Sequence, residues 1–200
     1  MARILLVRHA PTPETGTRLT GRLPGHSLGP DGETAARVAA ETLTPIKLKA
    51  VYASPLERTM ETAEIIATPH GLTPIVEEGV LEMDFGEWTG RTLKSLRRTA
   101  LWNTVQNVPS RMRFPGGETF AGAQNRAVEA VERVAADVGK ATAVIVSHSD
   151  VIKLVMSYYL GQPLDSFQRM MISTTSITDL RLAPGHSPFI VSINGTGVRT

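Results

Sequence analysis

Three short apolar runs, each followed directly by polar residues, constrain the fold of this chain most strongly. They are residues 4–7 (ILLV), 50–53 (AVYA) and 143–146 (AVIV), and the apolar residues in each run are continuous rather than alternating. A continuous run of this length is typical of a strand that is buried on both faces of a sheet. We therefore expect a central sheet that is covered on both sides.

Helical patterns alternate with these strands. We expect helices over four ranges: 31–43, 55–68, 118–140 and 150–161. Ser54 followed by Pro55 is typical of a helix start, with Ser54 as the capping residue and Pro55 as the first helical residue. The alternation favours a mostly parallel sheet with helices on both faces, which is a three-layer sandwich of the α/β class.

The rest of the chain is expected to hold loops and short strands. Loops are predicted at 11–30, 79–91 (leading into a short helix) and 102–117, and strands at 75–76, 176–181 and 189–193. The sequence has no internal repeat, and its 200 residues suit one domain with one core. We predict a single domain over residues 1–200.

Composition excludes several classes of protein. The chain has no cysteine, so disulfides, thiolate metal sites and a cysteine nucleophile are excluded. The apolar run 4–7 is too short for a secretory signal, and no segment has the length of a membrane span. The formal net charge is only +2, and the basic pairs Arg97–Arg98 and Arg111–Arg113 are isolated. We expect a cytoplasmic protein with neither a nucleic acid nor a membrane as its partner.

Polar side chains follow each of the three buried runs. Arg8 and His9 follow the first, Ser54 follows the second, and Ser147 and His148 follow the third. Ligands of open α/β sheets bind beyond the carboxyl ends of the strands. If the three strands are neighbours, the two histidines and the helix start after Ser54 converge at one site.

The residue types at this site suit phosphoryl chemistry. The site would offer two guanidinium groups, from Arg8 and Arg58, and a helix N-terminus. Together they suit a phosphoryl group, with its three charged oxygens, better than they suit a carboxylate ligand. A histidine beside them can act as a nucleophile toward phosphorus. Glu82 is the candidate proton donor for the leaving oxygen, and Asp84 and Glu87 are nearby competitors. Spacing alone does not assign the roles.

Five blocks of the sequence, in the same order, resemble the signature of the histidine phosphatase superfamily, also called the phosphoglycerate mutase-like family. The blocks are residues 6–12 (LVRHAPT), 54–63 (SPLERTMETA), 81–90 (LEMDFGEWTG), 114–119 (FPGGET) and 146–149 (VSHS). Together they span most of the chain. The resemblance implies a phosphoglycerate mutase-like fold.

The resemblance also implies roles for matching residues. His9 would be the nucleophile that becomes phosphorylated. Arg8, Arg58 and His148 would hold the transferred phosphoryl group and neutralise its charge. Glu82 would protonate the leaving group and then act as the base toward water. No metal and no other cofactor is implied.

Some positions depart from the family pattern. Ala10 replaces the glycine after His9. Thr15 stands near the place of a phosphate-contacting asparagine and is expected to donate one hydrogen bond to phosphate. Arg22, in the segment GRLPG, is expected to bind substrate, although Pro24 replaces a polar residue there. Ser149 replaces the glycine after His148 and is expected to narrow the pocket beside the substrate.

The resemblance favours a phosphatase acting on a small phosphorylated metabolite, because mutases of the family have a longer insertion between the third and last blocks. Here a small cap is expected around 91–117, with Trp102 packed inside it. Arg111 and Arg113 are more often solvated than bound to substrate at such positions. Mutase-type phosphotransfer and a non-catalytic phospho-ligand module are the alternatives.

The apolar strand at 189–193 could pair with a second copy to form a homodimer.

Overall fold

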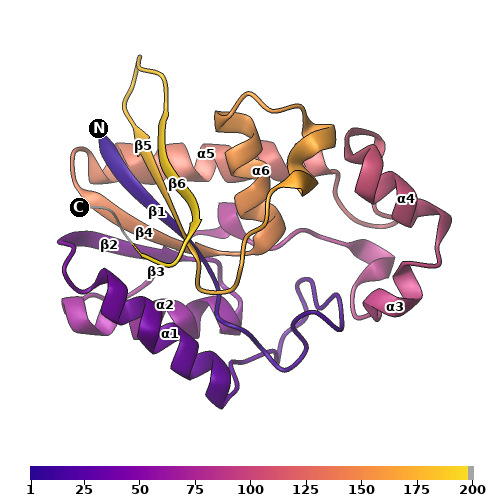
Figure 1. The fold of residues 1–200 in the computed structure, drawn as a ribbon, viewed down its shortest axis with the longest axis horizontal. Coiled ribbons are helices and arrows are strands. Elements are labelled where there is room, and N and C mark those ends of the chain that lie inside the picture. The colour runs from indigo at the N-terminus through magenta and orange to yellow at the C-terminus, as the bar shows by residue number, and fades with distance from the viewer. Residues whose placement is uncertain (198–200) are drawn as a thin grey trace.

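The computed structural model describes residues 1–197 and contains one six-stranded sheet, whose arrangement can be followed in Figure 1. The strands are β1 (Ala2–Arg8), β2 (Leu48–Ala53), β3 (Ile75–Val76), β4 (Thr142–Ser147), β5 (Ile177–Leu182) and β6 (Phe189–Gly195). Their spatial order is β3-β2-β4-β1-β5-β6. The first four strands run parallel, whereas β5 pairs antiparallel with both β1 and β6. The predicted mostly parallel sheet is confirmed.

Helices cover both faces of this sheet. The helices are α1 (Pro30–Leu43), α2 (Glu57–Ala67), α3 (Leu93–Leu96), α4 (Ala100–Asn107), α5 (Phe120–Val138) and α6 (Ser149–Tyr159). Successive side chains of a strand point to opposite faces. In β1, Ile4 and Leu6 therefore pack in one core with residues of α5 and α6, and Leu5 and Val7 pack in a second core with residues of α1 and α2. The three-layer sandwich is confirmed.

Two local predictions were wrong. Ser54 does not cap a helix, because α2 begins at Glu57 after Leu56 and the Ser54 hydroxyl lies against His148 instead. Residues 102–117 are not wholly irregular, since α4 begins at Ala100. Val105 of α4 is buried in a third apolar cluster. This packing against distant residues stabilises the helix, and it cannot be predicted from the neighbouring sequence alone.

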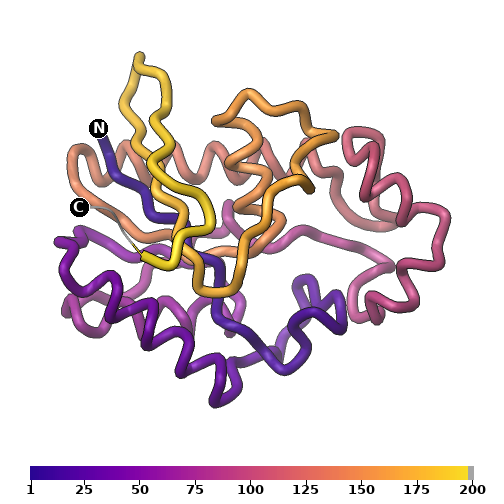
Figure 2. Tube along the Cα trace, in the orientation of Figure 1, coloured from indigo at the N-terminus to yellow at the C-terminus, as the bar shows by residue number. Residues whose placement is uncertain are grey.

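The helices α3 and α4 lie beyond the end of the sheet, in the segment expected to form a cap (Figures 1 and 2). Trp102 stacks on Trp88 with ring centroids 6.3 Å apart, as expected of a residue packed inside the cap. Backbone hydrogen bonds join this segment to the loop after β1. In one of them the Leu93 N–H donates to the Thr17 carbonyl over 3.0 Å. Among residues 1–197, no helix is long and apolar enough to cross a bilayer.

Candidate active site

The carboxyl ends of β2, β4 and β1 lie side by side at one edge of the sheet. In the strand register Ala53 pairs with Val146, and Arg8 pairs with Ser147. The pairing of β1 with β4 continues to His9, the first residue beyond β1, because the His9 N–H donates to the Ser147 carbonyl over 2.9 Å. The polar residues that follow the three strands therefore converge.

Two buried histidines form the centre of the site. The ring centroids of His9 and His148 are 5.3 Å apart, and the rings are tilted by 58°. His9 Nδ1 lies 2.7 Å from the Ala10 carbonyl oxygen. A carbonyl only accepts hydrogen bonds, so Nδ1 carries the proton and Nε2 keeps its lone pair. His9 is thus held in the tautomer that a nucleophilic Nε2 requires.

The surroundings of His9 keep its ring neutral. Burial, followed by the nearby Arg58 guanidinium, lowers the pKa of His9 from 6.5 to about 3, with Arg8 adding to the shift and the Ala10 hydrogen bond opposing it. Burial and the same arginine lower the pKa of His148 well below its usual value. Both imidazoles are therefore uncharged near neutral pH.

Two arginines flank the imidazoles with hydrogen-bonding capacity to spare. Arg58 is only 2% exposed; its Nη2 donates to the Gly21 carbonyl over 2.9 Å and lies 3.3 Å from His148 Nδ1. Arg8 Nη1 donates to the Ile172 carbonyl over 2.7 Å. Arg58 Nη1 and Arg8 Nε are buried and have no hydrogen-bond partner among the described residues. Buried cationic N–H groups without a protein partner can donate strong hydrogen bonds to the oxygens of a bound anion.

Glu82 lies beside His148 on a loop. Its Oε2 is 3.6 Å from His148 Nδ1, and its Oε1 accepts a hydrogen bond from the Met83 N–H over 3.0 Å. Burial, reinforced by the charge of Asp150 and opposed by Arg58, raises the pKa of Glu82 to about 7. A carboxyl group with this pKa can hold a proton or release it near neutral pH, as a general acid must.

Two hydroxyl groups for which no role at the site was predicted hold it together. Ser54 Oγ lies 2.8 Å from His148 Nε2, and both residues are fully buried. Thr62 Oγ1 accepts from the Ala10 N–H over 3.0 Å and donates to the Arg58 carbonyl over 2.7 Å. The position of Ser54 after a strand at the same edge was a usable signal for the first contact. Thr62 belongs to the block 54–63 that resembles the family signature, and this match was a usable signal for the second residue.

Three of the residues expected to contact phosphate or substrate are engaged with the protein, namely Thr15, Arg22 and Ser149. Thr15 Oγ1 accepts from the Thr12 N–H over 2.9 Å. Arg22 Nε donates to the Glu82 carbonyl over 2.7 Å, so this arginine supports the Glu82 loop. Ser149 Oγ lies 3.5 Å from the Ile172 carbonyl, which also receives Arg8. Their contacts with a substrate stay predictions.

The competitors for the acid role differ from Glu82 in their surroundings. Asp84 is 44% exposed in its side chain and accepts from the Gly86 N–H over 2.9 Å, and Glu87 is exposed. Arg111 and Arg113 are exposed as well. Over residues 1–197, His, Asp and Glu side chains nowhere gather in a group of three that could hold a metal ion.

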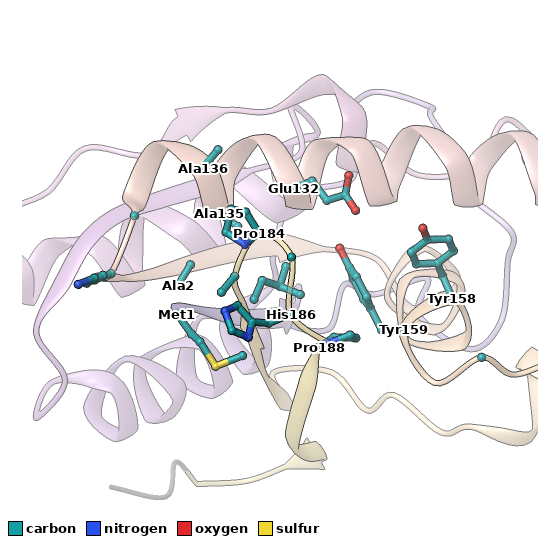
Figure 3. Close-up of a pocket in the computed structure, with 16 residues that line it drawn as sticks. Met1, Ala2, Glu132, Ala135, Ala136, Tyr158, Tyr159, Pro184, His186 and Pro188 are labelled. Carbon is teal, nitrogen blue, oxygen red and sulfur yellow. The ribbon is translucent and has the colours of Figure 1, made fainter.

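A separate cavity of about 930 Å³ lies away from these residues (Figure 3). It is lined by the ends of α5 and α6, by Met1 and Ala2 at the start of β1, and by the turn between β5 and β6. Because β1 ends at Arg8, this cavity is at the opposite end of the strand from His9. It contains none of the convergent histidines and arginines.

Residues 4–196 match the family model described as histidine phosphatase superfamily (branch 1). The chain is 32% identical to phosphoserine phosphatase 1 of Hydrogenobacter thermophilus, over 84% of this chain and 80% of that protein. It is 28% identical to the probable phosphoglycerate mutase GpmB of Erwinia tasmaniensis, over 96% and 89%. Its structure resembles Bacillus stearothermophilus YhfR with a TM-score of 0.91 and 26% identity, over 100% and 98%.

Proposed function

Because this chain belongs to the histidine phosphatase superfamily, branch 1, we propose that it hydrolyses small phosphomonoesters through a phosphohistidine at His9. The observation that carries this proposal is the pairing of a neutral, oriented His9 with two arginines that have buried N–H groups to spare. Glu82, a carboxyl group whose pKa is raised to about 7, completes the set. The site has a nucleophile, an anion clamp and an acid within one edge of the sheet.

In the first half-reaction His9 Nε2 attacks phosphorus. The N–P bond forms as the P–O bond to the leaving group breaks. Arg8, Arg58 and His148 stabilise the phosphoryl oxygens, whose charge is spread in the transition state. Glu82 gives its proton to the leaving oxygen, so the alcohol departs neutral and Glu82 becomes a carboxylate.

In the second half-reaction water attacks the phosphohistidine. The Glu82 carboxylate takes a proton from the water as its oxygen bonds to phosphorus. The N–P bond breaks, inorganic phosphate leaves, and both His9 and Glu82 return to their starting forms. The cationic side chains supply the charge neutralisation that a metal ion would otherwise provide, so we propose that no metal or other cofactor is required.

Phosphotransfer of the mutase type is the second candidate, because one of the similar proteins is named a probable phosphoglycerate mutase. The two reactions share the first half-reaction and differ in the acceptor, which is water in one and a hydroxyl of the sugar acid in the other. We favour water because the segment between Gly90 and Phe114 is short. A non-catalytic ligand module would have no use for an acid such as Glu82 beside the clamp.

Hydrolysis of p-nitrophenyl phosphate and of phosphoserine, both in the presence of a metal chelator, tests the proposal. Phosphoserine is the first alkyl substrate to try, because a similar protein is named a phosphoserine phosphatase. We expect activity to survive chelation and to fall at least about 1,000-fold in His9→Ala, since the covalent route is lost. Glu82→Gln should lose about 100-fold on phosphoserine. Full activity in His9→Ala would overturn the mechanism.

We propose a cytoplasmic enzyme that acts on a small substrate, without nucleic acid or membrane partners. A second copy would pair along β6, which is the edge strand of the sheet and whose Phe189 is 63% exposed. An unpaired edge with apolar side chains favours association. Sedimentation velocity of the wild type beside Phe189→Lys tests this dimer, and a monomeric wild type would contradict it.

A further inference from the structure

The loop that bears Glu82 is held by side chains from elsewhere in the molecule. Residues 79–82 comprise the last two residues of a short 3₁₀ turn (Glu78–Val80) and two residues that follow no regular structure. Each of their four carbonyl groups nevertheless accepts a hydrogen bond from a distant side chain. The Val80 carbonyl, for example, accepts from Ser147 Oγ at the end of β4 over 2.8 Å. The backbone of this loop is therefore held by side-chain donors, whereas the backbone of a strand is held by the N–H groups of a neighbouring strand.

Arg126 of α5 supplies most of these bonds. Its Nη1 donates to the carbonyls of Gly79 (2.9 Å) and Leu81 (2.7 Å), and its Nη2 donates to the Glu82 carbonyl over 3.2 Å. One guanidinium therefore contacts three of the four carbonyls that lead up to the acid. Its side chain is 24% exposed, so these bonds are shielded from much of the solvent.

Glu118, within the PGGE segment, fixes Arg126 in turn. Its carboxylate accepts from Arg126 Nε over 3.1 Å and from Nη2 over 2.7 Å, a two-pronged contact. Glu118 Oε1, the oxygen that accepts from Arg126 Nη2, also accepts from the Asp84 N–H over 2.9 Å and from Arg22 Nη2 over 3.1 Å. Both sides of Glu82 along the chain are therefore tied to one carboxylate and its arginine.

We propose that Arg126, oriented by Glu118, is a positioning residue for the reaction, which fixes the backbone of residues 79–82 so that the Glu82 carboxyl faces the leaving oxygen. This inference rests on the phosphatase function proposed above. The planar guanidinium is needed, because Arg126 makes five hydrogen bonds in two directions. A lysine has one nitrogen and cannot span three carbonyls and a carboxylate.

A positioning role predicts a defect that depends on the leaving group. A poor leaving group needs protonation by Glu82 as the P–O bond breaks, and a good one does not. The specificity constant kcat/KM reports the steps through P–O cleavage, so the second half-reaction does not mask the effect. The ratio of kcat/KM for phenyl phosphate to kcat/KM for p-nitrophenyl phosphate therefore measures how well Glu82 delivers its proton.

The experiment measures this ratio in the wild type, Arg126→Lys, Glu82→Gln and the double variant. A small displacement of a catalytic group is costly, so we expect the ratio to fall about tenfold in Arg126→Lys and about 100-fold in Glu82→Gln. The double variant should match Glu82→Gln, because Arg126 acts through Glu82. Arg126→Lys keeps the positive charge, so a fall in the ratio reports geometry.

Arg133→Lys is the matched control. Arg133 lies seven residues further along α5, and its Nη2 pairs with Glu77 Oε1 over 2.9 Å, just before the Glu82 loop. We expect the ratio to stay at the wild-type value in this variant. If Arg126→Lys fails to fold by circular dichroism, Glu118→Gln replaces it, with the same direction of change expected.

The outcomes separate the two proposals. A parallel loss of kcat/KM on both substrates in Arg126→Lys, with no change in the ratio, would overturn the positioning role alone. So would a further fall of the ratio when Arg126→Lys is added to Glu82→Gln. A wild type that hydrolyses neither substrate, or a Glu82→Gln variant with an unchanged ratio, would overturn the proposed mechanism and this inference with it.

Discussion

At the scale of single residues, the site is assembled from buried groups that each depend on a partner. His9 is oriented by a backbone carbonyl, His148 by the Ser54 hydroxyl, and the backbone after His9 by Thr62. In a buried site a missing partner costs more than the bond itself contributes, because the orphaned group stays away from water. Small polar residues near the two imidazoles should therefore matter for both stability and rate.

Ser54→Ala tests this dependence. The change removes the hydrogen-bond partner of His148 Nε2 at 2.8 Å. We expect the free energy of unfolding to fall by about 1–3 kcal/mol, since a buried ring nitrogen is left unsatisfied. We expect kcat to fall about tenfold, because the ring is no longer held in one orientation. Urea denaturation and steady-state kinetics measure the two effects.

Ser157→Ala is the control for Ser54→Ala. Ser157 is also fully buried, but its hydroxyl donates to the Gln162 carbonyl over 3.0 Å near the end of α6. It should lose a similar free energy of unfolding and keep its kcat. A Ser54→Ala enzyme with wild-type kcat would contradict the orienting role of this hydroxyl.

At the scale of elements, helices and loops fix the turn that follows β1. Thr62 of α2 holds the Ala10 N–H, and α1 packs against the next residue, Pro11. A Cβ at Gly32 in α1 would lie 2.2 Å from the Pro11 carbonyl oxygen. The position of α1 is therefore coupled to the backbone two residues after the nucleophile.

Gly32→Ala should be destabilising, although alanine is normally the better helix former. The usual gain is up to about 1 kcal/mol in a helix interior, and Gly32 lies in the first turn of α1. Here the new methyl group must displace the Pro11 backbone, so we expect a net loss of about 1–3 kcal/mol in the free energy of unfolding, as for other overpacked positions. We also expect a lower kcat/KM. Glu41→Ala, on an exposed position of α1, should change neither quantity, and an equally stable Gly32→Ala would show that α1 can shift freely.

At the scale of the whole molecule, the site carries an electrostatic cost that depends on pH. The ordinary pKa of Glu82 is 4.5, and in the folded protein it is raised to about 7. Between these values the folded state holds a proton that the unfolded state has lost, so this group makes stability fall as the pH rises through that window. His9 acts in the opposite sense, because its pKa is lowered from 6.5 to about 3, and its contribution falls as the pH drops below 6.5.

Glu82→Gln should therefore stabilise the protein in a pH-dependent manner. At pH 8 the wild type buries a charged carboxylate that the variant lacks, and we expect the variant to gain about 1–3 kcal/mol in the free energy of unfolding. At pH 4 both side chains are neutral, and the gain should vanish. Urea denaturation at the two pH values measures the difference. An equal gain at both would show that titration of Glu82 is not the cause.

The sequence by itself determined the layers of this fold and the polar ends of its strands. Continuous apolar runs of four residues cannot face water on either side, so β1, β2 and β4 had to be buried and covered by helices. The residues that follow such strands had to emerge at the edges of the sheet. This reasoning predicted that His9 and His148 converge if their strands are neighbours, and the strand order β2-β4-β1 meets that condition.

Only the tertiary structure decided which groups hold these residues in place and how they titrate. Ser54 meets His148 across 94 positions of the chain, and Arg126 reaches the Glu82 carbonyl across 44. Local pattern describes a residue through its near neighbours, and it therefore assigned Ser54 to a helix cap. The raised pKa of Glu82 likewise comes from burial and from Asp150, which lies on another element. Such effects exist only once distant segments have packed together and excluded water.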